Sequence, residues 1–174
     1  YPDPSISTGR VIGTGSVYLD GDDIAWSPTD TFMSSDRKHF TVSLWVYRRA
    51  NYSSTNYFVR CSDFGIFQTA GDDIGVATWL APSGSTNSAK YSTPLNTWTH
   101  IAATYDGSYI RLYVNGVYRV ATAWSGSISD PNYMLTIGGV SAGTIGSWYG
   151  NLDDLRIYNK TLTSNEIHAL YVYR

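Results

Sequence analysis

An Asn-Gly pair between two runs of alternating apolar residues most constrains what this chain can fold into. Asn115-Gly116 separates residues 109–114 from residues 117–121, and every second residue of the first run is aliphatic. A type I′ turn needs a positive φ at both central residues, so Asn-Gly between two strand-like runs is the strongest short signal for a β-hairpin. The sequence therefore predicts two adjacent antiparallel strands here.

Similar short runs recur along the chain. We expect strands in residues 16–26 with a break at 20–23, and in residues 40–48, 57–61, 65–69, 74–80, 98–105, 134–138 and 147–158. Residues 81–93 have no periodicity and are expected to be a loop. The 16 Gly and 15 Tyr suit many tight turns between strands, and only 15% of residues are charged. These features predict an all-β fold, an antiparallel two-sheet β-sandwich or jelly roll.

The C-terminal region adds one short helix. Thr163 fits the N-cap and Glu166 the third helical position, which together make a capping box. Leu162 and Ile167 fit the hydrophobic staple around that box. We therefore expect a helix over residues 164–171.

Asp153, in the strand before this helix, has an unusual position. Strict alternation places Asp153 on the same face as Leu155 and Ile157, and Asp154 on the opposite face. A buried, unpaired carboxylate is very costly, so Asp153 should be protonated, paired or bound to a metal. Asp154 is expected at the surface or in a salt bridge.

Charge and composition exclude some classes of function. The net charge is -2 and there is no basic cluster, which argues against nucleic-acid binding. No apolar run is long enough for membrane insertion, and no signal peptide is visible. Cys61 is alone and is expected to be buried and inert. The chain opens with Tyr1-Pro2-Asp3-Pro4 and no initiator Met, so we expect part of a larger protein, with a lead-in over residues 1–15 and one domain over residues 16–174.

Four motifs in order resemble the laminin-G-like, concanavalin-A-like lectin/glucanase superfamily. They are Phe40-Thr41-Val42-Ser43-Leu44-Trp45-Val46; the run from Trp98 to Gly107; Leu112-Tyr113-Val114-Asn115-Gly116; and Leu152-Asp153-Asp154-Leu155-Arg156-Ile157-Tyr158 with Leu162, Glu166 and Ile167. The resemblance covers residues 16–172. It implies a jelly roll of two antiparallel sheets, one of them concave. Because the fold hosts lectins, carbohydrate-binding modules, adhesion domains, glycosidases and lyases, it does not by itself give a function.

The same resemblance implies a structural calcium that joins the N-terminal strand to the C-terminal one. The expected ligands are Asp153 with Asp20, Gly21 and Asp23 of the 20–23 turn, and which Asp of that turn binds stays open. Calcium takes 6–8 oxygen ligands, and a bent turn exposes carbonyl oxygens to it. The alternative is that backbone N–H groups or a Lys or Arg satisfy Asp153.

The sequence argues against an enzyme. A retaining glycosidase needs two carboxyl groups about 5–5.5 Å apart, and strand-borne pairs alternate along one face. The chain has no Glu-x-Asp-x-Glu run, and its only Glu, Glu166, belongs to the capping box. The three His are scattered, and His100 is expected to be structural.

Aromatic side chains are the expected ligand-binding groups, because their rings offer sugars a flat apolar surface with a polar edge. Eight of them lie in or beside loops or strand ends: Tyr52, Tyr57, Trp79, Tyr91, Trp124, Tyr133, Trp148 and Tyr149. Trp124, Trp148 and Tyr149 are the best exposed candidates, followed by Trp79 and Tyr133. Trp45 and Trp98 lie in the family strand motifs and are expected to be structural.

We therefore expect a non-catalytic, lectin-like module that binds a glycan or polysaccharide and is secreted or surface-exposed, with Ca²⁺ as a structural cofactor. The main alternative is a protein-binding adhesion or structural module of a surface, phage or viral fibre assembly. A glycoside hydrolase or polysaccharide lyase with an atypical site is the third interpretation.

Overall fold

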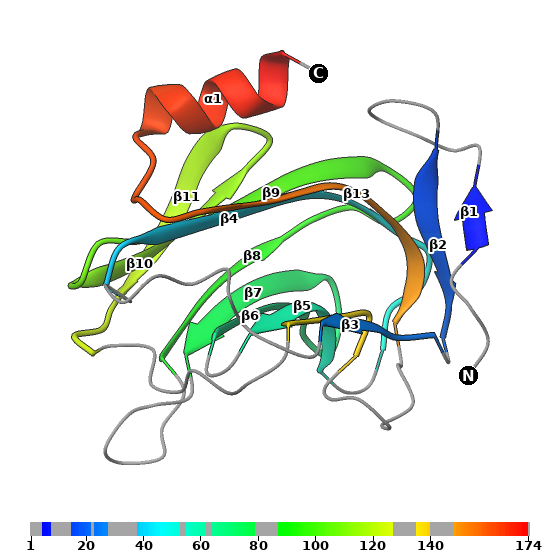
Figure 1. The fold of residues 1–174 in the computed structure, drawn as a ribbon. Helices are drawn as coiled ribbons and strands as arrows, with labels where there is room; N and C mark the ends of the chain where they lie inside the picture. The colour runs from blue at the N-terminus through cyan, green and yellow to red at the C-terminus, as the bar shows by residue number, and fades with distance from the viewer. Residues whose placement is uncertain are drawn as a thin grey trace.

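Two antiparallel β-sheets lie face to face in the computed structural model, which describes residues 5–7, 15–21, 23–27, 38–52, 55–61, 64–78, 87–126, 135–139 and 148–173 (Figure 1). The seven-stranded sheet has the order β1 (Ser5–Ser7), β2 (Ser16–Asp20), β13 (Tyr149–Tyr158), β4 (Phe40–Arg48), β9 (Trp98–Tyr105), β10 (Tyr109–Val114) and β11 (Val117–Ala123). The six-stranded sheet has the order β3 (Ala25–Ser27), β12 (Leu135–Ile137), β5 (Asn56–Cys61), β6 (Phe64–Gln68), β7 (Asp73–Thr78) and β8 (Asn87–Ser92). The predicted fold class is confirmed.

The strands with the clearest alternation have the predicted bounds. β4, β9 and β10 begin and end where the sequence places them. The predicted hairpin is also confirmed: Val114 pairs with Val117, and Asn115 and Gly116 have φ values of 52° and 72°. Local sequence signals therefore determine these elements.

The turn at residues 20–23 moves the chain from one sheet to the other. β2 ends at Asp20 in the seven-stranded sheet, and β3 begins at Ala25 in the six-stranded sheet. Gly21 has a φ of 108°, in a region that favours glycine. The predicted break is thus a sheet-to-sheet crossing.

Two strands were not predicted. β8 lies in the segment expected to be a loop, and β1 lies in the expected lead-in. β8 is mostly polar, but it pairs with β7 over six residues, and its Ala89 is buried against the core. Pairing with a neighbour, not local propensity, makes this segment a strand.

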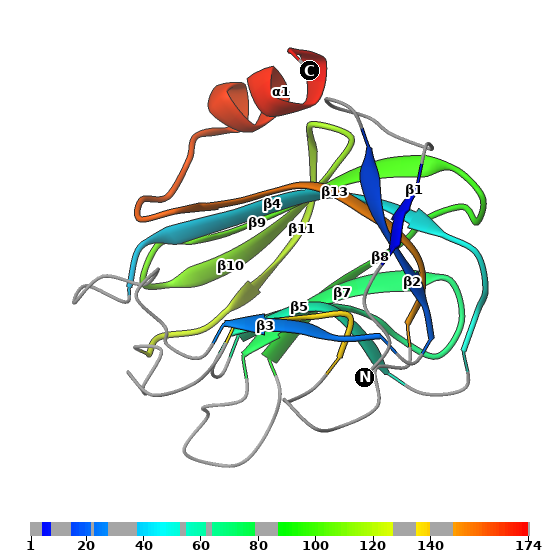
Figure 2. The same ribbon diagram turned by 45° about the vertical axis from the view of Figure 1, so that its right-hand side comes forward.

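Helix α1 (Ser164–Val172) lies over the outer face of the seven-stranded sheet (Figures 1 and 2). The capping box of Thr163 and Glu166 is present, and the staple residues Leu162 and Ile167 are both buried. Tyr171 of α1 stacks on Trp45 at 5.6 Å between ring centroids. Because the helix covers this face, β4 is buried on both sides over most of its length.

The main core fills the space between the sheets. Its largest members include Phe40, Leu44, Phe58, Phe64 and Trp148, each with at most 1% of its surface exposed. Cys61 is buried here as a free thiol, as predicted. One sheet is therefore covered on its outer side by a helix, and the core occupies its inner side.

Candidate functional site

A β-bulge in β13 changes the expected position of Asp153. Asp153 pairs with Trp45 and Arg156 with Ser43, so Asp154 and Leu155 together lie opposite one residue of β4. Asp154 takes up the extra residue with a φ of 49°. Leu155 and Ile157 pack against the core, whereas Asp153 shares the outer face with its partner Trp45. The expectation that Asp153 shares the apolar face was wrong, because alternation does not survive a bulge.

Neither acidic residue of this bulge is a buried, uncompensated charge. Asp153 is partly exposed, and its Oδ1 accepts a hydrogen bond from the backbone N–H of Asp154 at 2.7 Å. Asp154 forms an ion pair with Arg156, with 2.7 Å between Oδ1 and Nε. Of the two roles expected for Asp154, a surface position or a salt bridge, the structure shows the salt bridge.

The structure does not bring Asp153 together with the 20–23 turn. Tyr149 pairs with Asp20 and Leu152 with Val17, which places Asp153 next to the opposite end of β2 from Asp20. Four residues of a strand span about 13 Å. Asp23 is buried, and its Oδ2 accepts from the backbone N–H of Asp20 at 3.2 Å. Within the described ranges, no three His, Cys, Asp or Glu residues lie close enough together to hold a metal ion.

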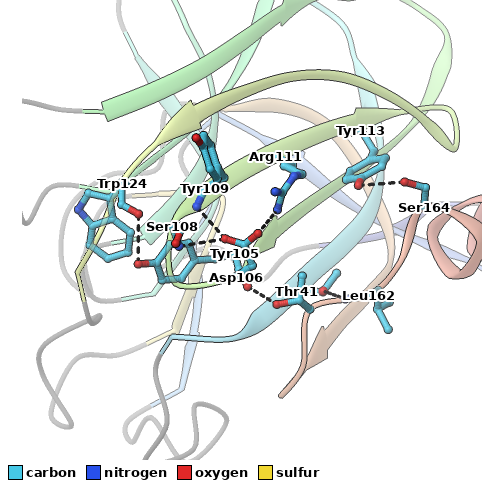
Figure 3. Close-up of polar contacts among 11 residues, drawn as sticks. Thr41, Tyr105, Asp106, Ser108, Tyr109, Arg111, Tyr113, Trp124, Leu162 and Ser164 are labelled. Atoms are coloured by element: carbon cyan, nitrogen blue, oxygen red, sulfur yellow. Dashed lines mark hydrogen bonds and ion pairs between the residues drawn. The ribbon is translucent and has the colours of Figure 1, made fainter.

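Two of the aromatic candidates are core residues, which corrects the expectation that they are exposed. Trp148 is fully buried with its ring 5.0 Å from that of Phe58, and Trp124 is 5% exposed with its ring 4.6 Å from that of Tyr105. The Tyr105 hydroxyl donates to the carbonyl oxygen of Gly126 at 2.6 Å and lies 3.4 Å from that of Trp124, the contact drawn in Figure 3. Large rings fill the gap between the sheets even where their sequence neighbours are small. Trp79 and Tyr133 lie outside the described residues.

Tyr149 is partly exposed and belongs to a surface group on the outer face of the seven-stranded sheet. Its ring packs edge-on against Tyr18 at 5.8 Å, and the Arg49 guanidinium lies 6.0 Å from its centroid. Trp98, which the sequence assigns to packing, is only half-buried and borders the same group. Of the three best exposed candidates, Trp124, Trp148 and Tyr149, only Tyr149 reaches the surface.

The outer face of the six-stranded sheet carries a second, larger set of aromatic and polar side chains. Two rows of cross-strand partners cross it: Trp26, Thr136, Arg60, Gly65, Ala77 and Ser88; and Tyr57, Phe67, Gly75 and Lys90. Cross-strand partners point to the same side of a sheet. We call this surface the open face, because α1 lies on the other sheet (Figure 2). Trp26 and Lys90 are exposed on it and Tyr57, Arg60 and Ser88 are partly exposed, whereas Phe67, Ala77 and Thr136 are buried, with 5%, 1% and 2% of their surface exposed.

The aromatic groups of the open face are held in fixed positions. The rings of Tyr57 and Phe67 are 5.7 Å apart at 59°, and the Arg60 guanidinium lies 5.6 Å from the Tyr57 ring. Phe67 lies over Gly75, where an added Cβ would be 2.6 Å from the ring. Trp26 projects at the edge of the same face with 52% of its surface exposed. Glycine thus lets a ring lie flat against the strand backbone.

A hollow of about 410 Å³ lies beside these rings. It is lined by Thr55, Tyr57, Phe67, Thr69, Ala70, Asp73, Ala77, Ser88 and Lys90. Small-molecule sites commonly occupy about 300–1,000 Å³. The hollow combines ring surfaces with hydroxyl, ammonium and carboxylate groups, so it can both stack against an apolar face and hydrogen-bond to a polar rim.

Electrostatics in the hollow favour binding over acid–base chemistry. Burial raises the pKa of Tyr57, partly opposed by the positive charge of Arg60, so its hydroxyl stays protonated at neutral pH. Among the described lining residues, Asp73 is the only carboxylate. Hydrolysis of a glycosidic bond by the usual route needs two carboxyl groups.

Ser43 and His100 form a hydroxyl–imidazole pair, but it is closed off from solvent. Ser43 Oγ and His100 Nε2 are 2.9 Å apart, and each residue is 1% exposed. The imidazole packs between Trp45 and Tyr171 of α1. No substrate can reach this pair in the folded chain, which agrees with the structural role predicted for His100.

Sequence reasoning missed most of the open face. Tyr57 was among the eight aromatic residues considered, but Trp26, Phe67 and Lys90 were not. Phe67 alternates with Ile66 along the strand and lies two residues from Gly65, so the sequence pattern alone could have placed it on the outer face. Lys90 lies in the segment expected to be a loop, so no face could be assigned to it. In β5, a bulge between Tyr57 and Val59 interrupts the alternation that would show which residues face outward.

Comparison with known families agrees with this architecture. Residues 19–168 match the family model described as the concanavalin A-like lectin/glucanases superfamily. The chain belongs to this superfamily. A search of curated proteins finds no match.

Several solved structures resemble the chain over almost its whole length. Domain 4 of AbnA, an extracellular GH43 arabinanase from Geobacillus stearothermophilus in complex with arabinotriose, matches with a TM-score of 0.77 and 21% identity, covering 97% of this chain and 81% of that one. The receptor-binding domain of the botulinum neurotoxin C/D mosaic serotype matches with a TM-score of 0.76 and 15% identity, covering 96% of this chain and 44% of that one. The binding domain of Paraclostridial Mosquitocidal Protein 1 matches with a TM-score of 0.76 and 16% identity, covering 97% of this chain and 45% of that one.

These likenesses concern the fold, since the identities are low. The structures that resemble the chain include a domain solved in complex with arabinotriose and a toxin receptor-binding domain. Among the described residues, no helix has the length and apolar character needed to cross a membrane.

Proposed function

We propose that this chain is a non-catalytic carbohydrate-binding module of an extracellular protein, secreted or surface-exposed. The observation that carries the proposal is the open face, where the accessible rings of Trp26 and Tyr57 lie with Arg60, Asp73 and Lys90 on one side of a sheet, and the buried Phe67 ring packs against Tyr57. Rings stack on the C–H faces of sugars, and the charged and hydroxyl groups hydrogen-bond the sugar hydroxyls. The arabinotriose complex of domain 4 of AbnA supports a saccharide as the ligand class.

The single carboxylate in the hollow supports a binding role. A retaining glycosidase places two carboxyl groups about 5–5.5 Å apart, and an inverting one about 6.5–9.5 Å apart. Asp73 has no such partner among the described lining residues. The hollow would therefore hold a sugar without cleaving it.

Binding to a panel of neutral polysaccharides and oligosaccharides, measured by glycan array and then by calorimetry, tests the proposal. We expect Trp26→Ala and Tyr57→Ala each to weaken binding about tenfold or more, because losing a stacked ring costs about 1–2 kcal/mol. Tyr118→Ala is the matched control, since Tyr118 is also 50% exposed but lies on the other sheet. An array without any saccharide ligand would reject the proposal, as would equal losses in all three variants.

A protein-binding adhesion module is the second candidate, favoured by the likeness to toxin receptor-binding domains. If the chain is such a module, a protein receptor should bind the wild-type chain and the Trp26→Ala variant with different affinities, and free saccharides should not displace that receptor. Competition by a free oligosaccharide would assign the open face to sugar.

We also propose a structural Ca²⁺ at the 20–23 turn. Asp153 does not fit this site, because the strand register separates it from Asp20. The remaining donors are the carboxylates of Asp23 and Asp20 with the backbone carbonyls of the turn, a mixture that suits calcium. The buried position of Asp23 supports the proposal, since a nearby cation would offset the cost of burying its charge.

A further inference from the structure

A second group of aromatic residues surrounds Arg49 on the outer face of the seven-stranded sheet, away from the open face. We call it the Arg49 site, and its members are Tyr18, Tyr47, Arg49, Trp98, Tyr149 and Asn151. The guanidinium carbon lies 5.1 Å from the Tyr47 ring centroid and 5.6 Å from that of Tyr18. Residues from β2, β4, β9 and β13 thus converge on one cation.

A buried amide holds the Arg49 side chain in place. Nε and Nη2 of Arg49 donate to Oδ1 of Asn151 at 3.3 and 3.0 Å. Asn151 is 2% exposed, and its Nδ2 donates to Ser16 Oγ at 3.2 Å, which fixes the orientation of the amide. An exposed arginine is therefore positioned before any ligand arrives, which lowers the entropy that binding would cost.

Among the residues that the structure describes, Arg49 has no ion pair that would neutralise its charge. In the described part of the chain, no carboxylate forms a salt bridge with it, whereas Arg111 pairs with Asp106 and Arg156 with Asp154. Asp20 is the nearby acidic group that faces the site, opposite Tyr149 in the strand register. A fixed guanidinium without a bound carboxylate is a ready partner for an anion.

The hydroxyl of Tyr18 stays protonated. A hydrogen bond with Tyr149 raises the pKa of Tyr18 to about 12, with desolvation and the charge of Asp20 adding to the effect and Arg49 opposing it. The Tyr18 hydroxyl thus remains a donor beside the cation at every physiological pH.

A hollow of about 200 Å³ opens between Tyr47, Arg49, Trp98 and Asn151. The Tyr47 and Trp98 rings lie 5.6 Å apart at 58° and form two of its walls. A flat apolar wall beside a positioned guanidinium matches a sugar ring that carries a negative group.

We propose that the Arg49 site is a second saccharide site, specific for acidic sugars, in which Arg49 binds a carboxylate or sulfate group and Tyr47 and Trp98 stack on the sugar ring. The proposal extends carbohydrate binding to a different sheet and does not require the open face to bind. A carboxylate and a sulfate present the same charged oxygens, so both are tested as separate probes.

Calorimetric titration of the whole chain with three probes tests this proposal: oligogalacturonate, a heparin-derived oligosaccharide and a neutral galactose oligosaccharide. We expect at least one acidic probe to bind, and Arg49→Gln to weaken that binding about tenfold or more. Raising NaCl from about 0.05 to 0.5 M should also weaken it, because salt screens charge.

Arg111→Gln is the matched control. Arg111 also lies over a tyrosine, with 5.3 Å to the Tyr109 centroid, but Asp106 neutralises it (Figure 3). Binding of the acidic probe should change less than twofold in this variant. Arg49→Lys, which keeps the charge but loses the planar fork, should fall between wild type and Arg49→Gln, and it guards against a folding defect in the latter.

Failure of both acidic probes to bind would overturn the proposal, and so would equal binding by Arg49→Gln and Arg111→Gln. A negative result for the Arg49 site can be told apart from a negative result for sugar binding at the open face. Trp26→Ala should leave the acidic probe bound at the Arg49 site, whereas loss of neutral-sugar binding alone would concern only the open face.

Discussion

At the scale of single residues, Asp153 shows how one inserted residue redirects a strand. The sequence predicts the strand and its neighbours, but alternation continues through Asp154 without a Gly that would mark a bulge. Aspartate tolerates the left-handed region better than most residues, so the bulge leaves little trace in the sequence. Asp153, the residue expected to bind calcium, therefore lies on the outer face of the seven-stranded sheet. On the open face of the other sheet, only Tyr57 was among the candidates identified from the sequence.

Gly75 offers a residue-scale prediction. In Gly75→Ala the new Cβ would meet the Phe67 ring at 2.6 Å, so the ring must tilt away from the sheet. Because the obstructing atoms are the far end of one side chain and not backbone, we expect the fold to persist, but Phe67 is only 5% exposed and must repack, at a cost of about 1–3 kcal/mol. Neutral-saccharide affinity should fall with it, as measured by calorimetry alongside urea unfolding.

Ala77→Gly is a suitable comparison, because Ala77 lines the same hollow in the next outward row, and its change removes a methyl group, whereas Gly75→Ala adds one against the Phe67 ring. If Gly75→Ala binds saccharide as wild type does, Phe67 is not part of the binding surface.

At the scale of elements, α1 was predictable and β8 was not. The capping box and staple of α1 involve residues three to five apart, so sequence contains the whole signal. β8 becomes a strand by pairing with β7, and its six residues include only one buried apolar side chain, Ala89. The same applies to β1, which pairs with β2 from the expected lead-in.

The start of α1 should respond to pH through Glu166. A hydrogen bond from Lys160 and further ones from Thr163 hold the pKa of Glu166 at about 2, well below its ordinary value of 4.5. A depressed carboxyl pKa contributes stability that is complete above 4.5 and is lost as the pH falls towards 2. Glu166→Gln should therefore lower the melting temperature at pH 7, and the difference from wild type should shrink by pH 2.5.

Thr163→Ala separates the cap from the charge. Removing the N-cap hydroxyl should cost about 0.5–2 kcal/mol in urea unfolding at pH 7. A melting-temperature difference between wild type and Glu166→Gln that stays constant from pH 7 to pH 2.5 would contradict the role given to the Glu166 charge.

At the scale of the whole molecule, the two sheets have different outer surfaces. α1 covers much of one, and the other carries the open face (Figure 1). The fold class could be predicted because alternation and turn residues are visible in short stretches of sequence, and the low charge is visible in the composition. The open face joins Trp26, Arg60 and Thr136, which are far apart in the chain, and only the strand order brings them into one row.

The proposed calcium gives a prediction for the stability of the whole domain. An ion bound only by the folded state stabilises it by about 2.7 kcal/mol at a hundredfold excess over its dissociation constant. Adding EDTA should therefore lower the melting temperature, and added CaCl2 should restore it. Asp23→Asn should remove this difference, whereas Asp153→Asn should keep it. An unchanged melting temperature in EDTA, with no calcium found by elemental analysis, would contradict the site.

The location of bound saccharide on the protein is the most direct test of the open face. A two-dimensional amide NMR titration of the labelled chain with a neutral oligosaccharide from the binding panel would locate it. We predict that the largest shifts fall on β5 to β8 and on β3 near Trp26, with little change in β4, β9 and β10. Shifts centred on the seven-stranded sheet, or an absence of saturable shifts with every saccharide in the panel, would contradict the account.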